Sequence, residues 1–409
     1  MVFALEDIKV VDFGQFVAGP VAARLMADLG AKVIKVEPLE GESLRPQRNS
    51  LDAFTKTFQQ GNAGKRAIAI DLRTEEGVSI IQKLIATSDV VSNNFRPGVA
   101  DRLGVGYEDA KRLNPKIIYC SAPGYGSIGP RWDKPGFEPL YSAFCGVHRN
   151  SGGHGNPPSR ATSFDQYCGL MGANAILMAL YHRDMTGLGQ HIEVAQLAQV
   201  LYYTSEVYFT GDEKMPWDPT LDPEQSGYHA LSRLYETSDD WICICCWSQK
   251  EWEALTNAIG QESLLSDPRF STAESRFLNG ADLIPTLKES FISETTLYWT
   301  RRFEELGVPF EVPIMDGEDQ ALVNDEHIES GLVAEHIHPV WGLMRAPGFA
   351  VGLSMTPGVS QSPPPLLGQH TKEILLELGY TPEQANNLKG DGIVTWSESE
   401  TGVQENVSV

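Results

Sequence analysis

Short apolar runs alternate with helix-like segments through the first 125 residues of the chain, and this alternation is the strongest constraint on its fold. Residues 8–13 (IKVVDF) have the composition of a buried strand, and residues 18–30 carry apolar side chains at helical spacing. Further strand-like runs follow at 31–37, 66–72, 89–95 and 116–124. Strands that alternate with crossover helices predict an α/β fold with a mainly parallel sheet, whose ligands bind in the loops after the strands.

A different pattern begins near residue 225. It predicts two strands joined at Ser238–Asp240, then a helix that ends near Gly260, which is typical of an α+β domain. We therefore expect four parts: 1–200 as the first part of a large domain, 201–227 as a linker, 228–325 as a small α+β domain, and 326–409 as a return linker and C-terminal part completing the large domain.

Charge and composition limit the classes of binding partner that we expect for this chain. The chain has 32 basic and 54 acidic residues, a net charge of −22, so we expect neither nucleic acid nor an anionic membrane surface as a partner. No apolar run is long enough to span a bilayer, and the first residues lack the features of a secretory signal. The six cysteines follow neither a disulfide framework nor a zinc pattern. Reduced thiols and a cytoplasmic setting are expected, without a metal site.

Residues 124–129 (GYGSIG) match the glycine pattern of a dinucleotide-binding loop, but Pro130 and no helix follow them, so that interpretation fails on context. Basic residues are more informative. Several of them fall in or next to the post-strand loops of the first half and together predict a site for an extended phosphorylated ligand. They are Arg45, Lys65, Arg66, Arg73, Arg96 and Arg102.

Asp165 stands immediately ahead of a long run of small and apolar residues. A carboxylate there is typical of the N-cap of a buried helix. The same placement suits a functional carboxylate, and the local pattern leaves the two interpretations open.

The chain resembles the class III CoA-transferases, also called the CaiB/BaiF family. The resemblance begins with residues 10–45, where a strand leads to an AGP turn, a helix ending in DLGA and a VIKVE strand. NAGKRAIAIDL, NFRPGVADRLGVGYE, SFDQYCG and PPPLLGQHTKEILLELGY follow in family order, so that it extends over residues 5–394. It implies a Rossmann-like large domain joined to a small domain, an interlocked homodimer, no tightly bound cofactor, and coenzyme A or acyl-CoA and carboxylates as substrates.

The resemblance also implies roles for single residues. Asp165 aligns with the catalytic aspartate, which forms a mixed anhydride with the acyl group and then an enzyme–CoA thioester. Positions matching the coenzyme-binding region are Gln15, Val17, Ala18, Arg45, Ile70, Asp71, Leu72, Arg73, Asn94, Phe95, Arg96, Arg102, Phe137 and Glu138. Three departures from a formate- and oxalate-specific relative disfavour oxalate as a substrate: Val17 replaces its glutamine, Pro38 its arginine, and Gly227 alone stands where it has a run of glycines.

Two alternatives remain. The 2-methylacyl-CoA racemases of the same family need a histidine at the position of Phe137, which cannot exchange a proton. Glu138 is the nearest substitute, but we expect its side chain to point elsewhere. A non-catalytic CoA-binding protein is the other alternative. A group of aromatic residues suits either an apolar acyl pocket or a helix core: Tyr202, Tyr203, Tyr208, Phe209 and Trp217.

Overall fold

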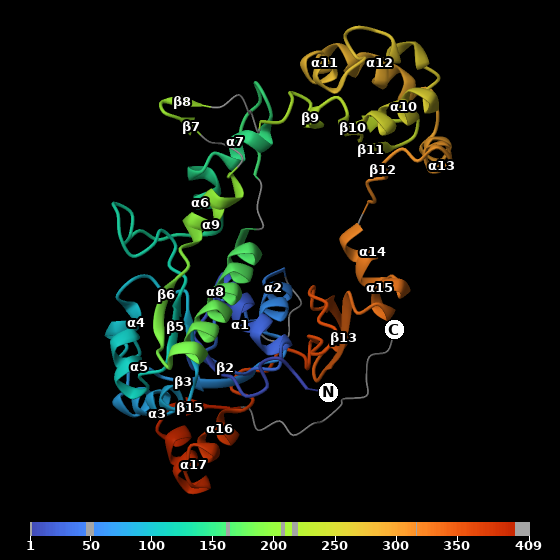
Figure 1. Ribbon diagram of the computed structural model, residues 1–409. Coiled ribbons are helices and arrows are strands. Elements are labelled where there is room, and N and C mark those ends of the chain that lie inside the picture. The colour runs from blue at the N-terminus through green and yellow to red at the C-terminus, as the bar shows by residue number, and fades with distance from the viewer. Residues whose placement is uncertain are drawn as a thin grey trace. The chain divides into compact units, whose positions relative to one another are not determined.

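The structure is a computed structural model, and it describes residues 2–45, 53–160, 164–205, 209–214, 220–315 and 317–396. By its internal contacts the chain divides into two compact units (Figure 1). The first comprises residues 1–141, 162–203 and 321–409, and the second comprises residues 142–161 and 204–320. The sequence-based division placed residues 142–161 in the large domain, whereas the contacts group them with 204–320.

A seven-stranded sheet in the order β15-β3-β2-β1-β4-β5-β6 forms the centre of the first unit. All neighbouring strands are parallel except β15, which pairs antiparallel with β3. The predicted α/β fold with a mainly parallel sheet is therefore confirmed. The strands are β1 (Lys9–Asp12), β2 (Lys32–Glu37), β3 (Arg66–Ile70), β4 (Val90–Asn93), β5 (Ile118–Ser121), β6 (Gln190–Glu193) and β15 (Val394–Thr395).

The helices of the first unit follow the predicted crossovers. Thr74 caps α3 by accepting a hydrogen bond from the Gly77 N–H. The helices are α1 (Ala18–Asp28), α2 (Ala53–Asn62), α3 (Glu75–Ala86), α4 (Val99–Arg102), α5 (Tyr107–Leu113), α8 (Phe164–Thr186), α9 (Gln196–Tyr203), α15 (Asp325–Glu329), α16 (Thr371–Glu377) and α17 (Pro382–Gly390). Two further helices, α6 (Glu138–Phe144) and α14 (Gly317–Val323), contain residues of both units. A hairpin of β13 (Val333–His338) and β14 (Gly342–Pro347) precedes α16.

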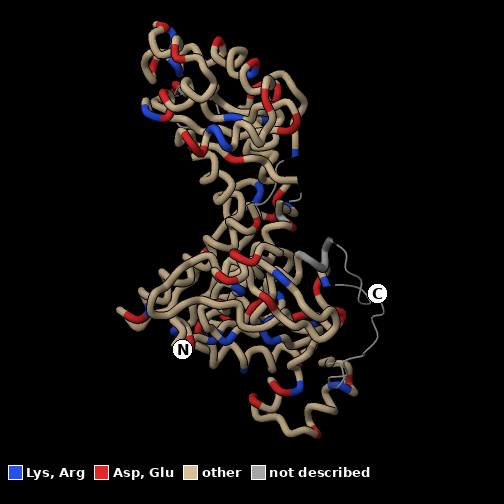
Figure 2. The backbone as a smooth tube through the Cα atoms, turned by 90° about the vertical axis from the view of Figure 1, so that its right-hand side faces the viewer, with Lys and Arg blue, Asp and Glu red and all other residues tan. Residues whose placement is uncertain are grey.

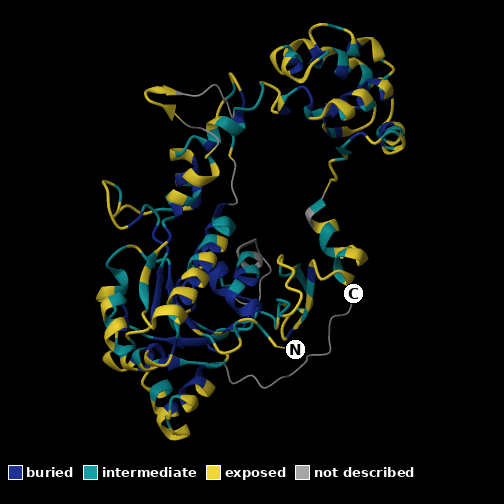
Figure 3. Ribbon diagram, in the orientation of Figure 1, coloured by how far each residue is buried: buried dark blue, intermediate teal, exposed yellow. Residues whose placement is uncertain are grey.

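Helices α1 and α8 pack closely because α8 carries glycine where the two helices meet. A Cβ atom on Gly169 would lie 2.5 Å from Cγ1 of Val21, and one on Gly172 would lie 3.0 Å from Cβ of Ala22. Ile176, one turn further on, is fully buried in the core beside β1 and β5. This face of α8 brings the first turn of α8 toward the N-terminal half of α1. In the first unit, Figure 3 shows the buried residues concentrated in the sheet, α1 and the facing side of α8.

The second unit is an antiparallel sheet covered by helices. The sheet has the order β12-β11-β10-β9, and Trp252, Phe291 and Phe303 fill its core. Its elements are α7 (Val147–Gly152), β7 (Phe209–Thr210), β8 (Glu213–Lys214), β9 (Gly227–His229), β10 (Ser232–Glu236), β11 (Trp241–Cys245), α10 (Gln249–Ala258), a 3-10 helix (Glu262–Leu265), α11 (Ala273–Leu278), α12 (Gly280–Ile292), α13 (Thr296–Leu306) and β12 (Phe310–Glu311). Within the described ranges, no helix combines the length and the apolar character needed to cross a membrane.

Candidate active site

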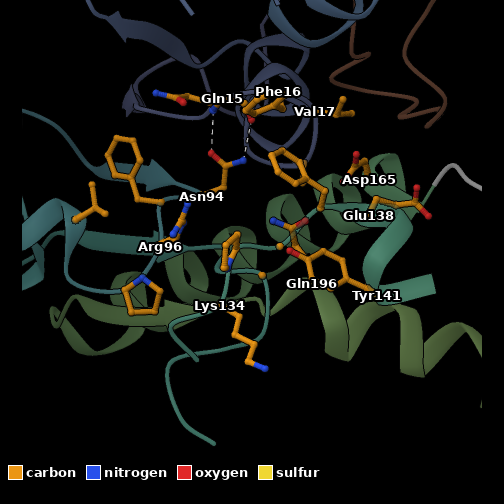
Figure 4. Close-up of a pocket in the computed structure, with 18 of the residues that line it drawn as sticks. Gln15, Phe16, Val17, Asn94, Arg96, Lys134, Glu138, Tyr141, Asp165 and Gln196 are labelled. Atoms are coloured by element: carbon orange, nitrogen blue, oxygen red, sulfur yellow. Dashed lines mark hydrogen bonds between the residues drawn. The ribbon is translucent and has the colours of Figure 1, made fainter. Parts of the chain in front are cut away.

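A cavity of about 300 Å³ lies in the first unit, at the carboxyl ends of β1 and β4 (Figure 4). Its walls are formed by the loops after β1 and β4, by residues 132 and 134–137, and by the starts of α6 and α8. Its lining residues are Gln15, Phe16, Val17, Ala18, Asn94, Phe95, Arg96, Pro97, Val99, Gly124, Trp132, Lys134, Pro135, Gly136, Phe137, Glu138, Tyr141, Asp165 and Gln196. The parallel sheet therefore places its cavity at the edge that the sequence predicts.

Asp165 lies in the first turn of α8 and is partly buried. Burial raises the pKa of its carboxyl to about 6, and the charge of Glu138 adds to this increase. The carboxylate is still mostly ionised at neutral pH, as a nucleophile or a general base requires. Because α8 begins at Phe164, Asp165 is the second residue of the helix rather than its N-cap; residues 161–163 lie outside the described part of the chain.

Glu138 is the first residue of α6 and lines the same cavity as Asp165. Its side chain is buried, with 6% of its surface exposed, and Figure 4 shows it beside Asp165. The expectation that Glu138 points elsewhere is therefore wrong. The cause is the start of α6, whose direction the local sequence does not determine. Two carboxyl groups thus lie at one end of the cavity.

Cys168 follows Asp165 by one turn of α8 and is a possible second nucleophile by position alone. Burial raises the pKa of its thiol to about 12, and the charge of Asp165 adds to the increase. The thiol is therefore protonated at neutral pH and is a poor nucleophile. The nucleophilic group favoured by this site is the Asp165 carboxylate.

Tyr141 is almost fully buried, with 1% of its surface exposed, and its ring lines the cavity. Its hydroxyl is packed against two glycines. A Cβ atom added to Gly124 would lie 2.2 Å from the Tyr141 hydroxyl oxygen, and one added to Gly136 would lie 2.0 Å from it. No described residue forms a hydrogen bond with this hydroxyl. Larger residues at either glycine would displace the ring, so both glycines preserve the shape of the cavity wall.

Arg96 and Lys134 supply positive charge to the cavity. Both side chains are exposed, and within the described ranges neither forms an ion pair. Figure 4 shows them at a distance from the two carboxyl groups. The cavity therefore joins an acidic end to a basic one, an arrangement that suits a long ligand with a reactive group at one end and phosphates at the other.

The cavity brings together part of the predicted set: Gln15, Val17, Ala18, Asn94, Phe95, Arg96, Phe137, Glu138 and Asp165. Asn94 is well placed to shape it, because its side chain accepts a hydrogen bond from the Gln15 N–H at 2.8 Å and donates one to the Gln15 carbonyl at 2.7 Å.

The other predicted residues lie outside the cavity lining. Arg45 donates to both carboxylate oxygens of Glu37 and to the Pro365 carbonyl. Arg73 is exposed and paired with Asp71 at the end of β3, and Arg102 is exposed on α4. Ile70 is buried in the core, and Leu72 packs against that core.

Lys65 and Arg66 do not lie in a post-strand loop, because they are where the chain enters β3. Lys65 is buried and paired with Asp12, and Arg66 is paired with Glu377. The interpretation of these two as ligand-binding cations is wrong. Sequence position alone cannot reveal a partner that is distant in sequence.

The three described residues of the aromatic group do not line this cavity. Tyr202, Tyr203 and Phe209 are each more than half exposed, so they belong neither to the cavity lining nor to a buried helix core. Tyr208 and Trp217 lie outside the described residues.

Several lining residues were not found by the sequence analysis, namely Phe16, Trp132, Lys134, Tyr141 and Gln196. Trp132 and Lys134 had a usable signal, since an aromatic and a basic residue directly follow the glycine-rich loop at 124–129. The described lining contains no histidine, and no group of three or more His, Cys, Asp or Glu side chains in the described ranges is arranged to hold a metal ion.

Comparison with known proteins gives one consistent result. Residues 5–371 match the sequence profile of CoA-transferase family III. The chain is 32% identical over 403 residues to a succinyl-CoA:glutarate CoA-transferase of Homo sapiens, covering 97% of this chain and 91% of that protein. It is 31% identical over 406 residues to the beta subunit of a succinyl-CoA–L-malate CoA-transferase of Chloroflexus aurantiacus, covering 95% and 98% of the two chains.

The fold also matches solved structures. A CAIB/BAIF family protein from Brucella suis superimposes with a TM-score of 0.76 at 28% identity, covering 92% of this chain and 100% of that one. A Mycobacterium tuberculosis protein superimposes with a TM-score of 0.78 at 27% identity, covering 91% and 99%.

The raised pKa of Asp165 predicts a stability effect. Because its pKa is higher in the folded chain than the ordinary 3.8, ionisation of Asp165 destabilises the fold as pH rises through the interval up to about 6. Asp165→Asn removes this penalty. We expect the variant to be more stable than wild type at pH 8 by about 1–2 kcal/mol, allowing for solvent screening of a partly exposed group.

Urea unfolding of both proteins at pH 4 and pH 8 measures this difference, which should be small at the lower pH. The matched control is Asp133→Asn, an exposed carboxylate in a cavity loop, whose effect should stay within about 0.5 kcal/mol. Equal stability of wild type and Asp165→Asn at pH 8 contradicts the prediction.

Proposed function

The chain belongs to CoA-transferase family III and is a CoA-transferase enzyme, and from this premise we propose that Asp165 carries the transfer covalently. The proposed reaction moves coenzyme A from an acyl-CoA thioester to a carboxylic acid. The observation that supports it most strongly is the Asp165 carboxylate itself. It lies in the wall of a cavity beside a second carboxyl group, with a pKa of about 6 that leaves it ionised at neutral pH.

The chemistry proceeds by exchange at carbonyl carbons. A carboxylate oxygen of Asp165 bonds to the thioester carbonyl carbon, and the carbon–sulfur bond breaks to release CoA thiolate and leave a mixed anhydride. The thiolate then attacks the Asp165 carbonyl carbon and expels the donor carboxylate, which gives an aspartyl–CoA thioester. The acceptor carboxylate attacks this thioester to form a second anhydride, from which the returning thiolate makes the new acyl-CoA and frees Asp165. The thioester energy is conserved throughout.

The start of α1 supplies donors for the oxyanions of these steps. Val17 is the N-cap and Ala18 the first residue of α1, and both line the cavity. Their backbone N–H groups donate to no acceptor among the described residues. Free N–H groups at a helix N-terminus favour negative charge. They therefore suit the oxygen that becomes negative when a carbonyl group is attacked.

Coenzyme A would extend from Asp165 toward the basic end of the cavity. Arg96 and Lys134 are the cations that we assign to its phosphates, with Asn94 and Phe95 along the way. The predicted positions outside the lining, Arg45, Ile70–Arg73 and Arg102, stay proposals for the outer part of the coenzyme.

The two named relatives transfer CoA from succinyl-CoA, one to glutarate and the other to L-malate. We therefore propose short dicarboxylates as the first substrates to test, with succinyl-CoA as the donor. Medium-length apolar acyl-CoA donors belong in the same panel, because the aromatic residues that suggested an apolar pocket lie partly outside the described residues.

A second candidate is exchange of the α-proton of an acyl-CoA. Glu138 beside Asp165 favours it, since two carboxyl groups can remove and return a proton at one carbon. The missing histidine at Phe137 disfavours it. Exchange would incorporate solvent deuterium at the α-carbon without any CoA adduct on the protein.

Covalent catalysis by Asp165 predicts a trappable intermediate. Wild-type protein incubated with succinyl-CoA and hydroxylamine should yield a hydroxamate at Asp165, detected by mass spectrometry of the digested protein. Asp165→Ala should lose at least about a thousandfold in kcat and give no adduct, because the nucleophile is gone. Exposed Asp133→Ala is the control and should keep wild-type kcat. Full transfer activity in Asp165→Ala would disprove the proposed function.

The pKa of Asp165 also predicts how kcat/KM depends on pH, with a limb on the acidic side of the profile. Since the nucleophile must be ionised, kcat/KM should fall about tenfold per unit as pH drops below about 6. Glu138→Gln removes the neighbouring charge that helps to raise this pKa, so the limb should move to lower pH. Burial is the larger cause, and so the limb should stay above the ordinary value for aspartate. A limb that moves upward, or does not move, contradicts the electrostatic coupling of these two groups.

We also propose a homodimer. One face of α8 is apolar and exposed, with Leu170, Met178, Tyr181 and Met185 each at least half exposed. A second copy is the partner that the resemblance to the family implies, and it would cover such a face. Light scattering at micromolar concentration should give about twice the chain mass of 45.0 kDa. Met178→Asp should reduce the mass toward that of one chain. A single-chain mass for the wild type would overturn this proposal.

A further inference from the structure

The loop that begins the cavity wall, residues 14–17, carries a strained residue. Phe16 has a φ of 60°, in the left-handed region that bulky side chains rarely adopt. Such a conformation costs on the order of 1–3 kcal/mol and persists only where the surroundings hold it in place. Phe16 leads directly into Val17 and Ala18, the start of α1, so its conformation sets the direction of the backbone there.

Glu42 holds the backbone of Phe16. Its Oε2 accepts a hydrogen bond from the Phe16 N–H at 3.1 Å, and its other carboxylate oxygen lies 3.3 Å from Nζ of Lys35. Glu42 is 5% exposed and Lys35 is fully buried. Nζ of Lys35 in turn donates to the Gly14 carbonyl at 2.9 Å. One ion pair therefore contacts the backbone on both sides of Gln15.

Neighbouring groups hold the rest of the loop. The Gly14 N–H donates to Asp12 Oδ1 at 2.8 Å, and Asp12 is paired with the fully buried side chain of Lys65 at 2.7 Å. The side chain of Asn94 bonds both the N–H and the carbonyl of Gln15. The backbone of residues 14–16 is thus bonded by side chains at every residue. Figure 2 shows where the basic and acidic residues lie along the backbone.

Stability alone does not account for this arrangement. Burying an ion pair costs several kcal/mol per ion before its contacts offset the cost, and apolar replacements of similar volume are often at least as stable. A loop that served only to connect β1 and α1 could use a glycine at position 16 and an apolar core beneath it. The buried charges instead determine one backbone geometry, in the wall of the cavity that contains Asp165.

We propose that Glu42 is a positioning residue for CoA transfer, acting through the strained backbone of Phe16. By holding that peptide group, Glu42 directs the backbone N–H groups of Val17 and Ala18 toward the reacting carbonyl. Lys35 keeps the Glu42 carboxylate in place. This inference rests on the proposed function, since it assigns the loop a task in the reaction at Asp165.

A double-mutant cycle between Glu42 and Phe16 tests the inference. Glu42→Ala should lower kcat by about tenfold to a hundredfold, with a smaller change in KM, because a misplacement of about 1 Å has effects of that size. Glu42→Gln should recover part of the loss, since its amide oxygen can still accept from the Phe16 N–H although its NH2 group cannot pair with Nζ of Lys35. Phe16→Gly removes the backbone strain. It also removes a ring that lines the cavity, so we expect some loss of activity. In that background Glu42→Ala should cost no more than about twofold, since glycine adopts positive φ freely.

Two further variants separate positioning from folding. Glu42→Asp keeps the charge but withdraws the carboxylate by one methylene group, so it should lower kcat like Glu42→Ala even if the alanine variant folds poorly. Asp28→Ala breaks another buried ion pair of the first unit, with Arg24 at 3.3 Å in α1, and should lower the melting temperature while leaving kcat within about twofold.

The outcomes are distinct. Wild-type kcat in Glu42→Ala and Glu42→Asp, together with a hydroxamate at Asp165 in the wild type, overturns this inference and leaves the proposed function intact. A loss from Glu42→Ala that is equally large in the Phe16→Gly background also overturns it. Full activity of Asp165→Ala overturns the proposed function and this inference with it. The inference is supported if Glu42→Ala lowers kcat when residue 16 is Phe but not when it is Gly, and if Glu42→Gln partly restores activity.

Discussion

The close approach of α1 and α8 is the contact on which the site depends. It exists because Gly169 and Gly172 present no side chain to Val21 and Ala22. The approach brings the first turn of α8, with Asp165, to the same cavity as the N-terminus of α1, with Val17 and Ala18. A carboxylate and two N–H groups that bond to no described acceptor, from residues nearly 150 positions apart, thereby line one cavity. In the mechanism proposed above, the first supplies the nucleophile and the others stabilise the charge that its attack creates.

The charges of the first unit serve two opposite purposes. Beneath the β1–α1 loop, Asp12, Lys35, Glu42 and Lys65 are buried and paired, and they hold backbone rather than ligand. In the cavity, Arg96 and Lys134 are exposed and form no ion pairs with described residues, which leaves them available to an anionic ligand. A strongly acidic protein can therefore bind a polyanion, because the relevant cations are few and local.

Much of the fold was predictable from the sequence. Strands β1 to β5 and the helices α1 and α3 follow from apolar periodicity, because it depends on neighbours in the chain. The predicted loops after β1 and β4 do form the cavity. The ion-pair partners of charged side chains were not predictable in the same way. Lys65 looked like a ligand-binding cation by position, but it is buried and pairs with Asp12, which is 53 positions away in the sequence. The sequence leads us to expect that the Glu138 side chain points elsewhere, whereas the start of α6 places it in the cavity with Asp165.

The sequence by itself determined the parallel sheet, the edge where ligands bind, and the family, because hydrophobic spacing and motif order are properties of the linear chain. It also singled out Asp165, through the resemblance to the family, although the local pattern alone favoured a helix cap. Only the tertiary structure decided the electrostatic state of that carboxylate. Its burial and the nearby Glu138 raise its pKa, and both result from the packing of α6 and α8 around one cavity. Likewise only the tertiary structure showed that Phe16 is strained and that Glu42 holds it, because a hydrogen bond between two loops depends on where the folded strands place them.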